Sequence, residues 1–191
     1  MLRRSRPATL ALAALLAACK GPAVPHPMTN ETRYLCCNLH YEKPEISDAN
    51  YLKGTLIPFG TRVHVLEVRK NTVKFQADGH PPITLVLKYG KDAIGMDQYL
   101  ELIFLREDPH AKLPKPGKDK KQAAAAERTR KLIEEGTVEP GMTKDEVVMT
   151  LGYPPVHRTP SLSASMWTYW QNRWATFEVY FDGDKVSRVQ R

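Results

Sequence analysis

The sequence has little cysteine and no hydrophobic run long enough to cross a membrane. Cys19, Cys36 and Cys37 are the only cysteines among 191 residues, too few for a disulfide scaffold or a four-thiolate zinc site. The apolar run from Ala8 to Ala18 is far shorter than the ~20 residues that a membrane span needs. HxxxH, HExxH, GxSxG, Walker and GxGxxG patterns are absent. These absences predict a protein that is not an enzyme, with no catalytic residues, no bound metal and no cofactor.

The excess of positive charge comes from two short segments. The net charge is +7, and Arg3, Arg4 and Arg6 supply three of these charges. Residues 112–121 contain five lysines and one aspartate, and the remaining residues balance 20 basic against 20 acidic side chains. A basic face for nucleic acid is therefore not expected. The hydrophobic content of 42% predicts a packed core rather than a disordered chain.

The N-terminus has the parts of an exported bacterial protein. A basic start, the short run Ala8–Ala18 and small residues before a cleavage site are typical of a secretory signal peptide. Leu16-Ala17-Ala18-Cys19 resembles the lipobox of bacterial lipoproteins. This resemblance implies cleavage after residue 18 and a diacylglycerol thioether on Cys19, which anchors the chain in a membrane. Lys20 stands where an aspartate often retains lipoproteins at the inner membrane, so the cell outer membrane, facing the periplasm, is expected.

The mature chain is predicted to be α+β. Residues 19–32 have three prolines and little apolar content, which is typical of an extended tether. Residues 33–105 are predicted to form a small β-rich module, SH3-like or a barrel, because short candidate strands alternate with turn signals. Those strands are Tyr34–Tyr41, Arg62–Arg69, Thr72–Ala77, Ile83–Lys88 and Leu100–Leu105. Residues 106–121, rich in lysine and proline, are expected to be a solvated linker.

The last third of the chain is predicted to contain two helices and a three-stranded antiparallel meander. The segment 122–135 lacks proline and glycine and contains four consecutive alanines, which favour a helix. A second helix begins at Thr143, which forms a capping box with Glu146. The three expected strands are Met166–Trp170, Trp174–Phe181 and Lys185–Val189.

This last third, residues 122–191, resembles a known lipoprotein family. The segment Glu139-Pro-Gly-Met-Thr-Lys-Asp-Glu-Val-Val-Met-Thr-Leu-Gly-Tyr-Pro154 is similar to the "GMT…V…LLG.P" signature of the SmpA/OmlA (BamE-like) family. Trp167-Thr-Tyr169 and the turn of Phe181-Asp-Gly-Asp-Lys-Val186 continue the pattern. The resemblance implies two helices packed on a three-stranded sheet. It also implies a lipid anchor and a role beside the outer-membrane protein assembly machine.

Cys36 and Cys37 form an adjacent thiol pair, with His40 three residues later. Three ligands are one short for a structural zinc site, and neighbouring strand residues point to opposite faces. In an oxidising periplasm three states remain open: a strained disulfide between the neighbours, two buried free thiols, or exchange with another chain. A structural role is expected rather than a catalytic one.

Aromatic residues crowd the predicted meander. Alternate ones are expected to fill the core, and Trp170, Trp174 and Tyr180 are the candidates for an exposed protein-binding surface. The lysine run of residues 112–121 is expected to be solvated, the alternative being contact with anionic lipid.

The sequence therefore predicts a non-catalytic envelope lipoprotein with a binding or scaffolding role, in outer-membrane protein assembly or envelope integrity. Its expected partners are outer-membrane or periplasmic proteins, and the membrane through the lipid anchor. The alternative is an inhibitor or cell-wall-binding lipoprotein that acts through the β-rich residues 33–105. A redox enzyme that uses Cys36 and Cys37 is a third hypothesis.

Overall fold

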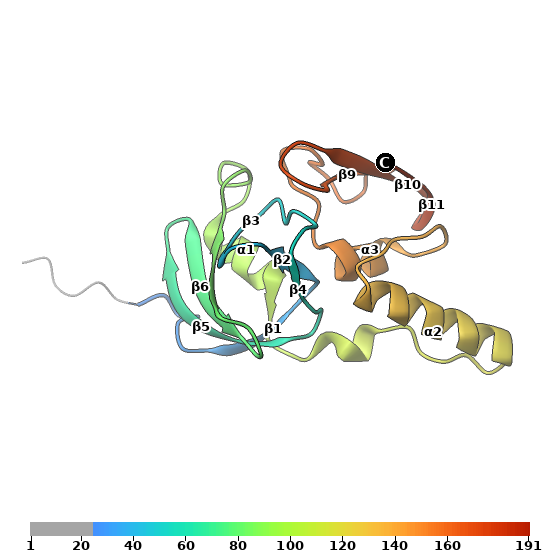
Figure 1. Cartoon of the computed structure of the whole chain (residues 1–191), viewed down its shortest axis with the longest axis horizontal. Helices are drawn as coiled ribbons and strands as arrows, with labels where there is room; N and C mark the ends of the chain where they lie inside the picture. The colour runs from blue at the N-terminus through green and yellow to red at the C-terminus, as the bar shows by residue number, and fades with distance from the viewer. Residues whose placement is uncertain (1–24) are drawn as a thin grey trace, which may run out of the picture.

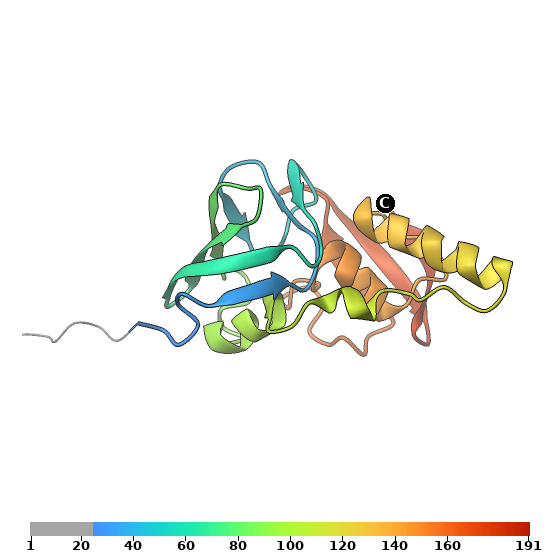
Figure 2. The ribbon, with the colours of Figure 1, turned by 90° about the horizontal axis from the view of Figure 1, so that it is seen from below.

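The computed structural model describes residues 25–191. The predicted signal peptide, the lipidation site Cys19 and most of the predicted tether therefore lie outside the described residues. The described chain is α+β. Its first residues lie at one end of a large sheet, and helix α2 (Lys120–Glu134) lies beyond the other end (Figures 1 and 2). None of its helices has the length and apolar content that a membrane crossing requires.

The largest element is a curled six-stranded sheet with the order β3-β7-β6-β5-β1-β8. Its strands are β1 (Thr32–Leu35), β3 (Glu45–Ser47), β5 (Arg62–Arg69), β6 (Thr72–Ala77), β7 (Pro82–Val86) and β8 (Phe104–Leu105). All neighbours pair antiparallel except β3, which runs parallel to β7. Val63, Val65, Val73 and Phe75 are fully or almost fully buried, because alternate residues of β5 and β6 face the core.

Helix α1 (Met96–Ile103) packs on this core. Met96, Tyr99, Leu100 and Ile103 are its buried residues, at the spacing that places side chains on one helical face. Phe104, directly after the helix, makes an edge contact with Phe75 on the sheet, with ring centroids 5.2 Å apart. The short strands β2 (Leu39–Tyr41) and β4 (Thr55–Ile57) form a two-stranded sheet of their own.

The C-terminal part has a second core. A 3₁₀ turn (Pro109–Lys112) leads to α2 (Lys120–Glu134) and α3 (Lys144–Leu151). These helices lie against the three-stranded sheet of β9 (Met166–Trp170), β10 (Thr176–Asp182) and β11 (Lys185–Gln190), as Figure 1 shows. The predicted capping box at the start of α3 is confirmed, since Thr143 and Glu146 satisfy each other's backbone N–H groups.

The predicted fold class is wrong. The chain is not a small β module followed by a two-helix, three-stranded domain, because the large curled sheet dominates it and the C-terminal core is not made by residues 122–191 alone. Phe59 is a buried member of that second core, and Leu52 and Leu113 pack against it. An SH3-like or closed barrel is also excluded as a description of residues 33–105, since they include helix α1, the separate β2–β4 pair and the open-ended six-stranded order.

Errors in two of the predicted strands explain much of the difference between the predicted and the observed fold. Tyr34–Tyr41 is broken after Leu35, and its two pieces join different sheets as β1 and β2. Leu100–Leu105 is mostly the end of helix α1, because the buried residues begin at Met96 and repeat with helical rather than strand spacing. In contrast, Arg62–Arg69, Thr72–Ala77 and Met166–Trp170 are strands with the predicted bounds.

Candidate functional site

A groove of about 850 Å³ lies on the surface of the described chain. One wall is the continuous segment from His40 to Ser47, which comprises the end of β2, a turn and β3. Tyr51 and Lys53 follow from the next loop, and Asn172, Arg173 and Trp174 form the opposite wall from the β9–β10 loop. The groove thus lies between residues of the first half of the chain and a loop of the C-terminal sheet.

Trp174 is the most prominent side chain of this groove. It is 85% exposed, whereas the other exposed large hydrophobic residues of the described chain, Leu162 and Met166, are 47% and 39% exposed. Its loop is ordered by Asn172, whose side-chain oxygen accepts hydrogen bonds from the backbone N–H groups of Trp174 at 2.8 Å and Ala175 at 3.0 Å. Trp174 therefore presents its indole ring to solvent from a turn that hydrogen bonds hold in place, at the border of the groove.

Four aromatic rings contact one another next to Tyr51, which lines the groove. The Tyr51 and Tyr89 hydroxyls are hydrogen-bonded at 2.8 Å, and His157 stacks between Tyr89 and Trp170 with centroid distances of 5.0 and 6.5 Å. Tyr51 also contacts Trp170 in an edge-to-face arrangement, with ring centroids 6.2 Å apart. We call Tyr51, Tyr89, His157 and Trp170 the aromatic cluster. Its members come from four separate parts of the chain, so the cluster fixes the relative positions of these parts.

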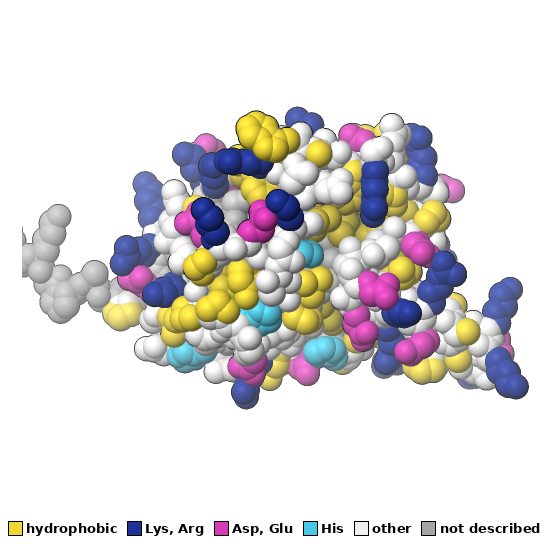
Figure 3. Space-filling view, in the orientation of Figure 1, with side chains coloured by type: hydrophobic (Ala, Val, Ile, Leu, Met, Phe, Trp, Pro, Cys, Tyr) yellow, Lys and Arg dark blue, Asp and Glu magenta, His cyan; other side chains and the backbone are white. Residues whose placement is uncertain are grey.

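Positive charge surrounds these rings. The guanidinium of Arg158 lies 5.9 Å from the Trp170 ring, that of Arg173 lies 5.4 Å from the Trp174 ring, and the Lys88 amine lies 5.1 Å from the Tyr89 ring. Each distance is suited to a cation–π contact. Burial is the largest cause that raises the pKa of Tyr51 to about 12, so its phenol stays protonated at neutral pH. In Figure 3 basic, acidic and hydrophobic side chains lie together on the face that carries β3 and the end of β9.

The predicted aromatic surface is brought together only in part. Trp170 and Trp174 both lie at the groove end of the C-terminal sheet, but Trp170 is half-buried within the aromatic cluster. Tyr180 pairs with Met166, at the other end of β9, and the guanidinium of Arg188 covers its ring at 3.8 Å. Of the three candidates, Trp174 is therefore the one that offers an open face at the groove.

Cys36 and Cys37 are joined as a disulfide between adjacent residues. This is the first of the three states that the sequence left open. The pair lies at the corner between β1 and β2 and is almost fully buried, at 6% and 0% exposure. His40 is not a partner of the sulfurs. Its backbone N–H donates to Asn50, and burial lowers the pKa of its imidazole.

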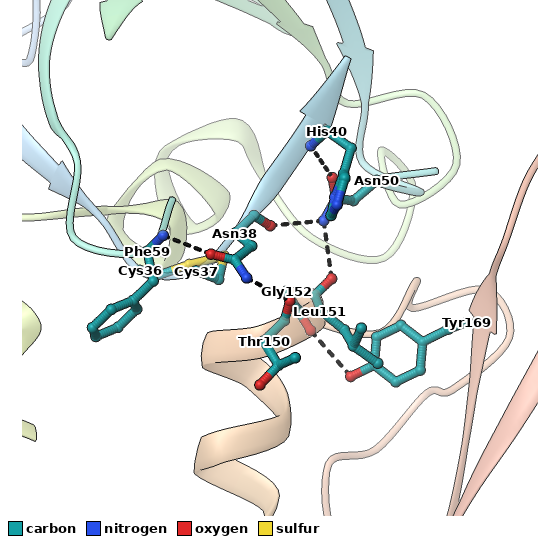
Figure 4. Close-up of a disulfide and its surroundings, with 10 residues drawn as sticks. All are labelled: Cys36, Cys37, Asn38, His40, Asn50, Phe59, Thr150, Leu151, Gly152 and Tyr169. Carbon is teal, nitrogen blue, oxygen red and sulfur yellow. Dashed lines mark hydrogen bonds between the residues drawn. A yellow bond between two sulfur atoms is a disulfide. The ribbon is translucent and has the colours of Figure 1, made fainter. Parts of the chain in front are cut away.

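The residue after the disulfide links the two halves of the chain (Figure 4). The Asn38 side-chain amide donates to the carbonyls of Ile133 at 2.6 Å and Thr150 at 3.1 Å, and its oxygen accepts from the Phe59 N–H at 2.7 Å. Asn50 similarly donates to the carbonyls of Asn38 and Leu151, both at 2.9 Å. These buried bonds hold the wall of the groove against the end of α3.

Two smaller cavities border the disulfide. Cys37 lines one of about 110 Å³, Cys36 lines one of about 330 Å³, and Tyr153 and Leu162 line both. The first is apolar, with Leu39, Leu87 and Tyr99 in its wall. A cavity of roughly 150 Å³ holds a benzene molecule, so this one takes at most a small apolar group.

No protein-family model, curated protein or solved structure matches this chain significantly. The resemblance to the SmpA/OmlA (BamE-like) family therefore stays a prediction. Within residues 25–191, no three His, Cys, Asp or Glu side chains come together to hold a metal ion.

Sequence reasoning missed most of the groove and of the aromatic cluster beside it. It selected Trp174 because aromatic residues crowd the C-terminal strands, but it gave no role to Tyr51, Tyr89 or His157. Each of these is an isolated aromatic residue between turn signals, and only the tertiary fold brings them together. The weak signal that was present is the mixed aromatic and charged composition of residues 40–53.

Proposed function

We propose that this chain is a lipoprotein of the outer membrane that faces the periplasm and binds other envelope proteins without catalysing a reaction. The lipobox-like sequence that ends in Cys19 supports the anchor, and the BamE-like resemblance of residues 122–191 supports a role in outer-membrane protein assembly. The observation that carries the binding role is the exposure of Trp174 beside the groove. Tryptophan, tyrosine and arginine are the residue types that dominate protein-binding energetics, and all three occur there.

A second candidate is a cell-wall-binding or inhibitory lipoprotein. The observation that favours it is the origin of the groove, because most of its lining comes from residues 40–53 rather than from the BamE-like segment. Sedimentation of the purified protein with peptidoglycan separates the candidates. A cell-wall binder is depleted from the supernatant, whereas a protein-binding lipoprotein is not.

The anchor is tested by metabolic labelling with palmitate and fractionation of membranes. The unmodified chain is expected to carry the label and to fractionate with the outer membrane, and Cys19→Ala should lose both properties. The double variant Cys36→Ser, Cys37→Ser is the matched control, since it retains the predicted lipidation site. Label that persists in Cys19→Ala would contradict the anchor.

The binding role is tested by cross-linking in cells, detergent extraction and identification of the co-purified proteins. Subunits of the barrel-assembly machine are expected with the unmodified chain and should be reduced with Trp174→Ala. Leu162→Ala removes another exposed apolar side chain, outside the groove, and should leave recovery unchanged. Recovery of bulk lipoproteins alone would contradict the assembly role.

A further inference from the structure

Strand β3 is an end strand of the six-stranded sheet, with a neighbour on one side only. It pairs in parallel with β7, through the register Glu45↔Thr84, Ile46↔Leu85 and Ser47↔Val86. An end strand exposes unpaired backbone groups, to which a further strand can be added. Natural proteins usually cover or charge such an edge, so its surroundings decide whether it is available.

The hydrogen bonds to β7 show which groups of β3 point outward. The Thr84 N–H donates to the Pro44 carbonyl, and the Asp48 N–H donates to the Val86 carbonyl. In a parallel pair alternate residues bond to the same neighbour, so Ile46 also faces β7, whereas Glu45 and Ser47 face away.

Two of these four outward groups have local partners. The Glu45 N–H donates to the Lys43 carbonyl, and the Ser47 carbonyl accepts from the Asn50 N–H. The Glu45 carbonyl and the Ser47 N–H have no hydrogen-bond partner among the described residues. If a further strand adds in parallel, one of its residues binds both groups. Its backbone N–H donates to the Glu45 carbonyl, and its carbonyl accepts from the Ser47 N–H.

The groove runs beside these groups. All residues from His40 to Ser47 line it, so the residues that carry the two unpaired groups border a space of about 850 Å³. Trp174 stands on the opposite wall and is 85% exposed. An extended peptide in this groove would therefore have backbone partners on one side and an indole ring on the other.

The charge of the groove indicates the chemistry of the peptide. Lys53 is paired with Glu42 at 3.0 Å. Lys43 and Arg173 remain as cations against the single carboxylate of Glu45, and none of these three forms an ion pair among the described residues. Lys88 and Arg158 add positive charge beside the aromatic cluster. Charge complementarity thus favours an acidic peptide.

We propose that the groove binds an extended acidic peptide of a partner protein by parallel strand addition to β3, with Trp174 packing on its side chains. This inference rests on the proposed protein-binding function and specifies where and how the partner is held. Because the backbone pair serves a single peptide residue, binding is weak unless the partner makes further contacts.

A labelled peptide tests the inference. The probe is the fluorescein-labelled heptapeptide Ser-Thr-Val-Glu-Val-Thr-Ser, titrated with the full purified chain in detergent and followed by fluorescence anisotropy. Trp174→Ala is expected to weaken binding about tenfold, the scale of an interface hot spot, and Leu162→Ala should not change it. A peptide with lysine in place of glutamate should bind several-fold more weakly, because it meets Lys43 and Arg173.

The backbone contribution is tested on both partners. Ser47→Pro removes the free N–H at an edge where proline is tolerated, and should abolish binding. Because this variant can also disturb folding, the heptapeptide N-methylated at its three central residues provides a test that leaves the protein unchanged. Undiminished binding of the N-methylated peptide would overturn strand addition. So would binding of a chitin-type oligosaccharide that depends on Trp174 in the absence of peptide binding.

Failure of this inference can be distinguished from failure of the proposed function. If barrel-assembly subunits still co-purify with Trp174→Ala and Ser47→Pro, the peptide site and the role given to Trp174 are wrong, whereas the role in outer-membrane protein assembly itself stands. If the unmodified chain captures no such subunits, the proposed function fails whatever the peptide does.

Discussion

The side-chain amide of Asn38 donates a hydrogen bond of 2.6 Å to the backbone carbonyl of Ile133, 95 residues later in the chain. The same side chain bonds to the Thr150 carbonyl and the Phe59 N–H, and it is completely buried. One residue therefore satisfies backbone groups of two helix ends and a loop. Because those groups have no access to water, Asn38 is an obligatory part of the contact between the halves.

Asn38→Ala should lower the free energy of unfolding by about 2–4 kcal/mol, because it removes three buried hydrogen bonds and leaves their backbone partners unsatisfied. Urea denaturation followed by circular dichroism measures this. Asn172→Ala is the control, since it breaks two bonds in a turn open to water and should cost less than about 1 kcal/mol. Equal effects of the two variants would contradict the role of Asn38.

Truncation of Trp167 and truncation of Trp174 should change the stability of the chain by very different amounts. Trp167 is 1% exposed in the C-terminal core, so Trp167→Ala should destabilise the chain by about 3–5 kcal/mol. Trp174→Ala removes a ring that is 85% exposed and should change stability by less than about 0.5 kcal/mol. Thermal denaturation of both variants checks this. A large loss of stability in Trp174→Ala would mean that the ring serves folding rather than binding.

His40 should make the protein less stable in mild acid. Burial lowers the pKa of His40 in the folded chain below its ordinary value of 6.5. Near that pH the unfolded chain therefore binds more protons than the folded chain, and acid favours unfolding. The free energy of unfolding should fall as the pH is lowered through 6.5, and the loss should end once the pH is below the folded-state pKa.

Urea denaturation at a series of pH values measures the His40 effect. His40→Gln should flatten the dependence between pH 6.5 and the folded-state pKa, whereas His64→Gln, which replaces an exposed side chain, should keep the slope of the unmodified chain. An identical slope in His40→Gln would show that another group controls this range.

The disulfide between Cys36 and Cys37 should resist reduction while the chain is folded. Its residues are 6% and 0% exposed, so a reductant reaches the sulfurs only when the structure opens. In a Cys19→Ala background, a mild reductant followed by maleimide should label these cysteines in urea but not in native buffer. Adding the exposed Ser163→Cys gives a site that reacts in both conditions. Rapid native labelling of Cys36 and Cys37 would contradict the burial.

Local features were predictable from sequence where the signal is itself local. Strand alternation in Arg62–Arg69 gave β5 with its bounds, and the Thr143–Glu146 spacing gave the start of α3. The fold class was wrong because it depends on contacts between distant segments. Nothing near Phe59 in sequence indicates that its ring joins the core of helices some 70 to 90 residues later.

The candidate site illustrates the same limit. The aromatic-rich segment around Trp174 predicts a binding surface there. The opposite wall of the groove begins at His40, within the segment Tyr34–Tyr41 that the sequence predicts to be one continuous strand. The role of Asn38 could not be predicted from sequence for a related reason. An asparagine between two short strands is typical of a turn, and its real partners, Ile133 and Thr150, are defined only once both helices are in place.

The bonds of Asn38 and Asn50 also set an order of events during folding. A chain is synthesised from its N-terminus, so the partners at Thr150 and Leu151 appear about a hundred residues after the asparagines that bind them. The first sheet can pair its strands earlier, but its corner at Asn38 remains incomplete until α3 exists. Contacts of such long sequence separation slow folding. A chain truncated before α3 should therefore have an incompletely folded corner at Asn38, which chaperones and proteases can recognise.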